Sequence, residues 1–363
     1  MSVNAFSAFM EDIEQAVSDK NIPWRDMSEA TVFITGVTGL IGSALVSILA
    51  FANEKYWLDL RIIGHGRNAA KGDALCKRCE IEFIGSDIRR PIPTETLPQK
   101  LDYIFHCAAI TKSADMVAKP VEVITTAIDG TRNVLELARD RHCGSFVYLS
   151  SMEVYGDVYG EAYGDAYGQT EAREVAETDL GYLDLSNPRS SYPESKRCCE
   201  LLCAAHASQH GFPVKIARLA QTFGAGTPRN DTRVFAQFAR SAAAGNEIEL
   251  HTEGKSRGNY CYTADAVRGL LTILLKGGDG EAYNVANPEA SMTIREMAGL
   301  LADAVCGGKI KVKVKTPEDI EKRGYAPDTG FRLNTDKLNA LGWTPMYGLS
   351  EMYKRMLSDW LER

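Results

Sequence analysis

The stretch TVFITGVTGLIG, residues 31–42, decides the fold of this chain. Its apolar start predicts a short buried strand, and SALVSILAFA at 43–52 predicts a helix directly after the glycines. Gly36 permits a tight turn, Gly39 lets backbone approach a pyrophosphate, and Gly42 allows the helix to pack closely on the strand. Because a helix N-terminus attracts anions, this unit predicts a dinucleotide-binding turn; a purely structural turn is the alternative.

The segments that follow alternate between strand and helix patterns. Further strands are expected at 60–66, 101–109, 145–150 and 214–219, and helices at 121–139 and 192–210. Such alternation is typical of a parallel sheet with helices on both faces. We therefore predict an α/β fold, namely a Rossmann-type doubly wound parallel sheet with a smaller α+β C-terminal substrate domain.

The alternation ends after residue 221, which divides the chain into three parts. Residues 1–29 are an N-terminal extension with an amphipathic helix, to which we assign no chemistry. The dinucleotide-binding domain is expected at 30–221, with a contribution from 259–277. The substrate-binding domain is expected at 222–258 and 278–363, over the carboxyl edge of the sheet.

The composition is that of a globular protein without a polyanionic partner. The 363 residues are 45% apolar and 25% charged, and 41 Lys and Arg against 48 Asp and Glu give a net charge of −7, so nucleic acid is not an expected partner. No apolar run reaches the 18 or so residues of a membrane helix, and acids stand near the start where a secretory signal is basic. We expect a cytoplasmic protein that binds no membrane.

The nine cysteines are an odd count spread over a long chain, which favours reduced thiols over a disulfide framework. Cys76 and Cys79 have C-x-x-C spacing, but no second pair accompanies them, so a zinc site or redox dithiol is the weaker interpretation. His206 and His210 lack the Glu of a metalloprotease motif and indicate a solvated helix face. We therefore predict no metal.

A motif of Tyr, Gly and a polar residue recurs every four residues from Tyr155 to Gln169. Glycine at each period argues against a stable helix. We interpret the segment as a mobile loop over the active site, and a functionless insertion is the alternative.

Two further motifs carry chemistry. In YPESK, Tyr192 and Lys196 lie four residues apart on the expected helix, so the phenol and the ammonium share a face, and the ammonium is expected to lower the pKa of the tyrosine toward that of a general base. In SSMEVYG, Ser151 ends an expected strand and could hydrogen-bond a reacting sugar oxygen. The alternatives are an ordinary helix surface and a strand-capping serine pair.

In this order and spacing, the three motifs resemble the extended short-chain dehydrogenase/reductase superfamily, specifically the NAD-dependent epimerase/dehydratase family. The resemblance extends from about residue 31 to RLNTDKLNALGWTP near the C-terminus. It implies that Tyr192 is the catalytic base, that Lys196 positions the nicotinamide ribose and tunes the tyrosine, and that Ser151 orients the substrate hydroxyl. It also implies a nucleoside-diphosphate sugar as substrate and a homodimer. The cofactor-binding residues that it implies are Gly36, Thr38, Gly39, Leu40, Ile41, Gly42, Arg67, Asp87, Ile88, Ala108, Ala109, Tyr192 and Lys196, and the substrate-binding residues are Thr111, Ser151, Gln221, Arg233 and Arg257.

Within the family, NPRSSYPESKR and the D-x-R-V at 231–234 are most similar to UDP-glucuronate decarboxylases. Glu153 falls where decarboxylases and 4,6-dehydratases carry a catalytic glutamate. Met152 stands where dehydratases place an acidic proton donor, and a thioether cannot protonate a leaving hydroxyl, which argues against dehydration.

Other positions depart from the family pattern. Ala127 and Gln221 stand where the family usually has Asn. Gly258 occupies the usual place of the phosphate-binding Arg. Arg257, one residue earlier, is therefore the candidate ligand of the diphosphate. The second strand ends without the acid that hydrogen-bonds the ribose of NAD, and Arg67 could instead hold the 2′-phosphate of NADP. The resemblance implies NAD as the cofactor, whereas these two features favour NADP.

The resemblance thus implies an enzyme that forms a 4-keto sugar, and 4-epimerisation and decarboxylation rank close together ahead of dehydration. The alternatives are an NADP-dependent keto-sugar reductase and a non-catalytic dinucleotide-binding protein on the same fold.

Overall fold

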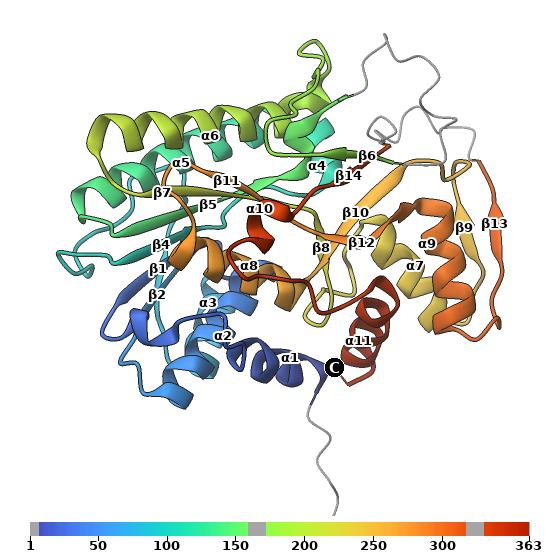
Figure 1. Ribbon diagram of the computed structural model, residues 1–363, viewed down its shortest axis with the longest axis horizontal. Helices are drawn as coiled ribbons and strands as arrows, with labels where there is room; N and C mark the ends of the chain where they lie inside the picture. The colour runs from blue at the N-terminus through green and yellow to red at the C-terminus, as the bar shows by residue number, and fades with distance from the viewer. Residues whose placement is uncertain (1–6, 159–171, 317–329, 363) are drawn as a thin grey trace, which may run out of the picture.

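The computed structural model describes residues 7–158, 172–316 and 330–362. A seven-stranded sheet forms its centre, and each pair of neighbouring strands is parallel, in the order β11-β7-β5-β4-β1-β2-β3 (Figure 1). This arrangement confirms the predicted α/β class. The strands are β1 Thr31–Thr35, β2 Arg61–Gly66, β3 Glu82–Gly85, β4 Tyr103–His106, β5 Ser145–Ser151, β7 Val214–Leu219 and β11 Ala282–Val285.

Helices cover both faces of this sheet, as the alternating pattern predicts (Figure 1). One face carries α5 and α6, which pack against each other, and the other carries α2 and α8. The helices of this part are α2 Leu40–Tyr56, α3 Ala69–Cys79, α4 Ser113–Ala118, α5 Pro120–Asp140, α6 Ser191–His210 and α8 Thr263–Lys276.

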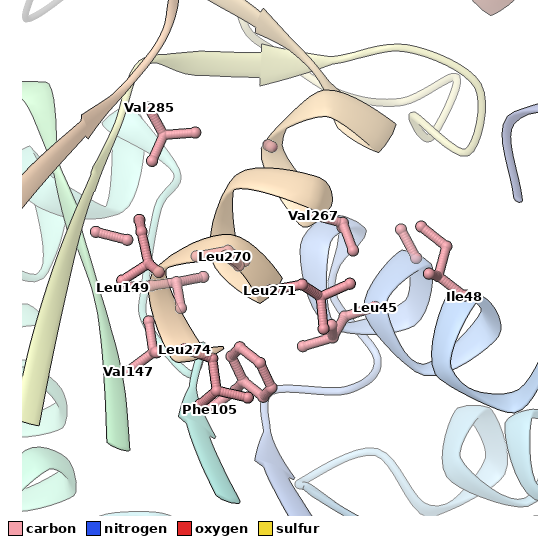
Figure 2. Close-up of a cluster of buried hydrophobic side chains, with 14 of the residues drawn as sticks. Leu45, Ile48, Phe105, Val147, Leu149, Val267, Leu270, Leu271, Leu274 and Val285 are labelled. Carbon is pink, nitrogen blue, oxygen red and sulfur yellow. The ribbon is translucent and has the colours of Figure 1, made fainter. Parts of the chain in front are cut away.

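The core between α8 and the sheet is shown in Figure 2. The buried side chains of Leu270, Leu271 and Leu274 lie between the sheet and the neighbouring helix α2. Phe105 of β4 and Val147 of β5 face them from the sheet. Apolar side chains at this spacing share one stripe of a helix, so their burial fixes α8 against the sheet.

A second core, which contains Phe223, Phe235, Tyr260 and Tyr353, lies among the elements that follow residue 221. Parts of the range expected for the substrate-binding domain join the first unit instead. β11 is the edge strand of the seven-stranded sheet, so the sheet extends to residue 285, beyond the expected boundary at 277. Phe331, Leu333, Leu338 and Trp343 belong to the first core. The remaining strands are β6 Arg173–Val175, β8 Gln221–Phe223, β9 Ile248–Leu250, β10 Arg257–Tyr262, β12 Asn287–Thr293, β13 Val312–Val314 and β14 Phe331–Leu333. The remaining helices are α7 Val234–Ala243, α9 Ile294–Leu300, α10 Asp336–Asn339 and α11 Leu349–Glu362, with short helices at Trp24–Met27, Met152–Tyr155, Pro188–Ser190 and Leu301–Val305.

The extension before β1 is integrated into the molecule. Its helix α1, Ala8–Val17, is capped by Ser7 and packs on α2, α8 and α11 (Figure 1). Just after it, the carboxylate of Asp19 accepts a hydrogen bond from Arg268 Nε of α8 at 2.7 Å, and Arg268 also pairs with Asp265 at 2.8 Å. All three side chains are buried, so this ion network is part of the core.

Of the Tyr-Gly repeat, only residues 155–158 lie within the described ranges. Tyr155 is fully buried, and its hydroxyl donates to Asn284 Oδ1 at 2.6 Å, so the first tyrosine of the repeat belongs to the core. The proposed mobile loop lies outside the described residues. Within the described ranges, no helix has the length and apolar character needed to span a bilayer.

Candidate active site

A cavity of about 1300 Å³ opens at the carboxyl ends of β1, β2, β4, β5 and β7 and extends to β8 and the start of α7. This is the edge at which sheets of this topology bind ligands. Most of the predicted site residues line it. They are Gly36, Thr38, Gly39, Leu40, Ile41, Gly42, Arg67, Ile88, Ala108, Ala109, Thr111, Ser151, Glu153, Tyr192, Lys196, Gln221 and Arg233.

The glycines at the start of α2 form a cradle without side chains. Gly36 has a φ of +71°, and a Cβ there would lie 2.8 Å from the backbone nitrogen of Ala108. A Cβ at Gly42 would overlap the Gly36 carbonyl oxygen. The two positions therefore require glycine, and they bring the bare turn and the N-terminus of α2 to the cavity, as a dinucleotide pyrophosphate requires.

Next to the cradle, the chain after β2 reaches Arg67, which the sequence analysis expects near the adenosine ribose, and enters α3. Arg67, Asn68 and Lys71 line the cavity there. Asp87 does not line it: its carboxylate forms an ion pair with Arg89 at 2.6 Å, and this hydrogen bonding lowers the pKa of Asp87 to about 2. The structure therefore does not bring the Asp87 carboxylate to the cavity with its neighbour Ile88.

Ser151, Tyr192 and Lys196 meet on one wall of the cavity, where β5 ends and α6 begins. The Tyr192 ring is 8% exposed and packs with Met116 and Val123. The Ser151 side chain is close enough to the Tyr192 hydroxyl to lower its pKa. Lys196 is buried, and its Nζ donates to the Leu149 carbonyl oxygen at 2.5 Å.

The prediction that Lys196 lowers the pKa of Tyr192 is wrong for the protein without a bound dinucleotide or substrate. The pKa of Tyr192 is raised, chiefly because burial disfavours the phenolate and further because Glu153 is close. The Ser151 side chain and the charges of Arg189 and Arg233 lower it. Helical spacing places Lys196 on the correct face, but its ammonium lies 4.6 Å from the ring centre of Tyr148 and 5.9 Å from that of Tyr192.

Glu153 is in the short helix that follows β5, and it lines the cavity beside Tyr192. Its carboxylate accepts a hydrogen bond from Arg189 Nη2 at 2.9 Å. Arg189 precedes α6 by two residues and is a functional candidate that the sequence analysis did not single out. The NPRSSYPESKR segment contains it, but only the fold shows that it faces Glu153.

The residues expected to bind the substrate are only partly brought together. Gln221 and Arg233 line the cavity across from the strand ends, and Arg233 also pairs with Asp231 at 2.7 Å. Arg257 does not line it, and its Nη1 donates to the Ser291 carbonyl oxygen at 2.9 Å. Successive side chains of a strand point to opposite faces, so a residue that is one position early on β10 is directed elsewhere.

A buried ion pair supports the catalytic wall from behind. Glu200, one helical turn after Lys196 on α6, accepts hydrogen bonds from Ser150 Oγ at 2.5 Å and from Arg218 Nη2 at 2.7 Å. Ser150 lines the cavity, so the pair connects α6, β5 and β7 directly beneath it. Among the described residues, no group of three or more His, Cys, Asp or Glu side chains is arranged to hold a metal ion.

Comparison with known proteins assigns the family. The model of the "NAD dependent epimerase/dehydratase family" matches residues 32–286. UDP-glucuronic acid decarboxylase 5 of Arabidopsis thaliana is 30% identical over 336 residues, covering 92% of this chain and 89% of the relative. UDP-glucuronic acid decarboxylase 1 of Xenopus tropicalis is 28% identical over 347 residues, covering 94% of this chain and 75% of the relative.

Solved structures agree in fold. The UDP-glucuronic acid 4-epimerase of Bacillus cereus in complex with UDP-glucuronic acid and NAD has a TM-score of 0.72 at 20% identity, covering 92% of this chain and 99% of that one. The UDP-glucose 4-epimerase of Thermotoga maritima has a TM-score of 0.73 at 22% identity, with the same coverage. These matches and the family model confirm the predicted resemblance: the chain belongs to the NAD-dependent epimerase/dehydratase family.

Proposed function

We propose that this protein binds a nucleoside-diphosphate sugar that carries a carboxylate, of the UDP-glucuronate type, and decarboxylates it through a 4-keto intermediate. The observation that carries the proposal is the placement of Ser151, Tyr192, Lys196 and Glu153 on one wall of the cavity that contains the glycine cradle. The relatives named decarboxylases support this branch, and the carboxylate of Glu153 is the group that simple epimerisation does not need.

The dinucleotide, when bound, accepts the C4 hydride of the sugar and returns it. Tyr192 takes the proton of the C4 hydroxyl, and the Ser151 hydroxyl orients the same oxygen. The 4-keto acid then loses carbon dioxide: the C5–C6 bond breaks, its electron pair moves toward the C4 oxygen, and C5 takes up a proton. We assign the transfer to Glu153, whose carboxylate takes up a proton from solvent water after carbon dioxide is lost and passes it to C5. Tyr192 returns its own proton to the C4 oxygen as hydride returns to C4.

The test is a product analysis by mass spectrometry on a panel of UDP, dTDP, GDP and CDP sugars, with and without added dinucleotide. We expect loss of carbon dioxide from a UDP-hexuronate without net consumption of NADH or NADPH. Isomerisation without loss of mass would instead establish a 4-epimerase. Stoichiometric consumption of NADPH would establish a reductase, and no turnover on any sugar would favour a non-catalytic dinucleotide-binding protein.

We propose further that the site accepts NADP as well as NAD, because Arg67 and Lys71 line the ribose end. Arg67→Ala is expected to weaken NADP binding by about tenfold and NAD binding by less, because only NADP offers a 2′-phosphate for a charge-assisted hydrogen bond. Calorimetry measures both affinities. Arg61→Ala, at the other end of β2 in an exposed pair with Glu82, is the control. Equal losses for the two dinucleotides would remove the basis for NADP binding.

We propose a homodimer that uses the outer face of α5 and α6. Val121 of α5 and Leu201 of α6 are 68% and 70% exposed, and the two helices pack side by side on one face of the sheet (Figure 1). Burial of these apolar side chains against a second copy would stabilise the association. Sedimentation of the purified chain measures its mass, and a monomer at micromolar concentration would overturn this assignment.

We retain the division into a dinucleotide-binding part and a substrate-binding part as a proposal, with β11 counted in the first. Limited proteolysis with and without dinucleotide tests it, because protection confined to the first part is expected.

We also propose a cytoplasmic location, since all nine cysteines are free thiols and such thiols persist in a reducing compartment. Cell fractionation tests the location, and recovery of the protein outside the cytoplasm would contradict it.

A further inference from the structure

Arg189 forms an ion pair that is largely withdrawn from water and lies beside the cavity wall. It lies in the short helix Pro188–Ser190, which Asn187 caps, three residues before Tyr192. Its side chain is 11% exposed, whereas the exposed pair of Arg61 and Glu82 has values of 42% and 48%. The guanidinium is therefore largely withdrawn from water, and a charge in such a place interacts strongly with its neighbours.

The contacts of Arg189 point to the cavity wall. Nη2 donates to Glu153 Oε2 at 2.9 Å, and Nε is buried with no hydrogen-bond partner among the described residues. Glu153 lines the cavity, whereas Arg189 does not. The arginine therefore stands behind the glutamate and holds it from the protein side.

The two charges act on Tyr192 in opposite directions. Glu153 raises the pKa of the phenol and Arg189 lowers it. The charged or titratable groups that face Tyr192 are Glu153 next to β5, Arg189 before α6, Arg233 before α7, Lys196 of α6 and Tyr148 of β5. Without Arg189, the carboxylate of Glu153 would stand beside the phenol with less compensation.

The substrate class makes this compensation important. A hexuronate whose C4 hydroxyl meets Tyr192 and Ser151 carries its own carboxylate on the adjacent carbon, C5. That group enters the part of the cavity in which Glu153 lies, and two like charges at close range repel each other. A counter-charge behind Glu153 reduces that repulsion without occupying the cavity.

We propose that Arg189 is a positioning residue that fixes the Glu153 carboxylate on the cavity wall and offsets its charge, so that the site accepts a sugar with a carboxylate of its own. This inference rests on the proposed function and adds the determinant of its substrate class. Arg189 acts through Glu153 and does not bind the substrate carboxylate itself.

The first experiment measures binding by calorimetry to the holoenzyme, with UDP-glucuronate and UDP-glucose as probes. Arg189→Gln is expected to weaken UDP-glucuronate by about tenfold and UDP-glucose by less than about twofold. Arg189→Lys, which keeps the charge, is expected to recover most of the loss. Arg295→Gln, which breaks the exposed pair of Arg295 with Glu253, is the matched control and is expected to change neither affinity.

The second experiment separates positioning from direct binding. In a Glu153→Gln background the repelling carboxylate is absent, so Arg189→Gln is expected to cost UDP-glucuronate almost nothing further. If Arg189→Gln weakens UDP-glucuronate binding as much in the Glu153→Gln background as in the wild type, Arg189 binds the substrate itself. That result would overturn the inference. Equal weakening of both probes by Arg189→Gln would also overturn it. If the wild type binds no UDP-glucuronate at all, the proposed function itself has failed, which is a distinguishable result.

The pH profile gives a readout of the charge on Tyr192. Loss of Arg189 removes a positive charge that favours the phenolate, so the ascending limb of kcat/KM against pH is expected to shift upward by about one unit in Arg189→Gln. Arg189→Lys is expected to return it toward the wild-type position. An unchanged limb in a folded Arg189→Gln protein would contradict the charge offset.

Discussion

Tyr192→Phe is expected to lower turnover by a factor of about 100 or more while dinucleotide binding stays nearly unchanged. The phenol of Tyr192 is the titratable group that lies beside Ser151 at the reacting end of the cavity. Phenylalanine keeps the ring packing against Met116 and Val123. The binding of the dinucleotide depends on the glycine cradle at the other end, which the substitution does not touch. Steady-state kinetics and calorimetry measure the two effects.

The matched control is Tyr103→Phe on β4. Its hydroxyl donates to the Asp26 carbonyl oxygen, remote from the cavity wall, so its removal is expected to leave turnover unchanged. Because burial raises the pKa of Tyr192, activity of the wild type should increase with pH over the neutral to alkaline range, and this dependence should be absent in Tyr192→Phe. Near-normal turnover of Tyr192→Phe would disprove its role as the base.

Glu153→Gln should stall the reaction after oxidation and lower turnover by about 100-fold. The amide oxygen still accepts a hydrogen bond from Arg189, so the side chain keeps its place, but an amide cannot exchange the proton needed at C5. Reduced nicotinamide should then accumulate in the bound state. Its near-ultraviolet absorbance in a single turnover with UDP-glucuronate measures the accumulation.

Glu194→Gln is the control for this substitution. Glu194 pairs with Arg197 at 3.1 Å on the same stretch of α6 as Tyr192, but it does not line the cavity. We expect it to leave turnover unchanged. Unchanged turnover of Glu153→Gln on the true substrate would contradict the decarboxylase branch and favour the epimerase, for which Tyr192 and hydride transfer suffice.

The part of the site made of backbone and helix geometry could be predicted from the sequence. The strand, the glycine turn and α2 follow from local patterns, and the spacing of Tyr192 and Lys196 follows from the pitch of α6. These features depend on residues that are near in sequence, so a single chain contains the information. The parallel sheet follows from the repeated alternation of its elements.

The parts that depend on distant partners could not be predicted. The pairing of Glu153 with Arg189 joins residues 36 apart in sequence. Asp87 pairs with Arg89, which is near in sequence, but whether its carboxylate turns to Arg89 or to the cavity is decided by the fold. The hydrogen bond of Arg257 with the Ser291 carbonyl oxygen depends on the pairing of β10 with β12, which the local sequence does not specify. The pKa of Tyr192 depends on burial, which only the assembled fold determines.

The buried ion network of the N-terminal extension has a consequence for synthesis on the ribosome. Asp19 and its partner Arg268 are 249 residues apart, and Asp12 reaches Arg355 across 343 residues. During translation, Asp12 of α1 and Asp19 after it can form these ion pairs only after Arg355 and Arg268, respectively, have been synthesised. Contacts of such long range are slow to form. The nascent dinucleotide-binding part therefore emerges before the edge strand β11 and the covering helix α8 have been made, and one edge and one face of its sheet stay uncovered until late in translation.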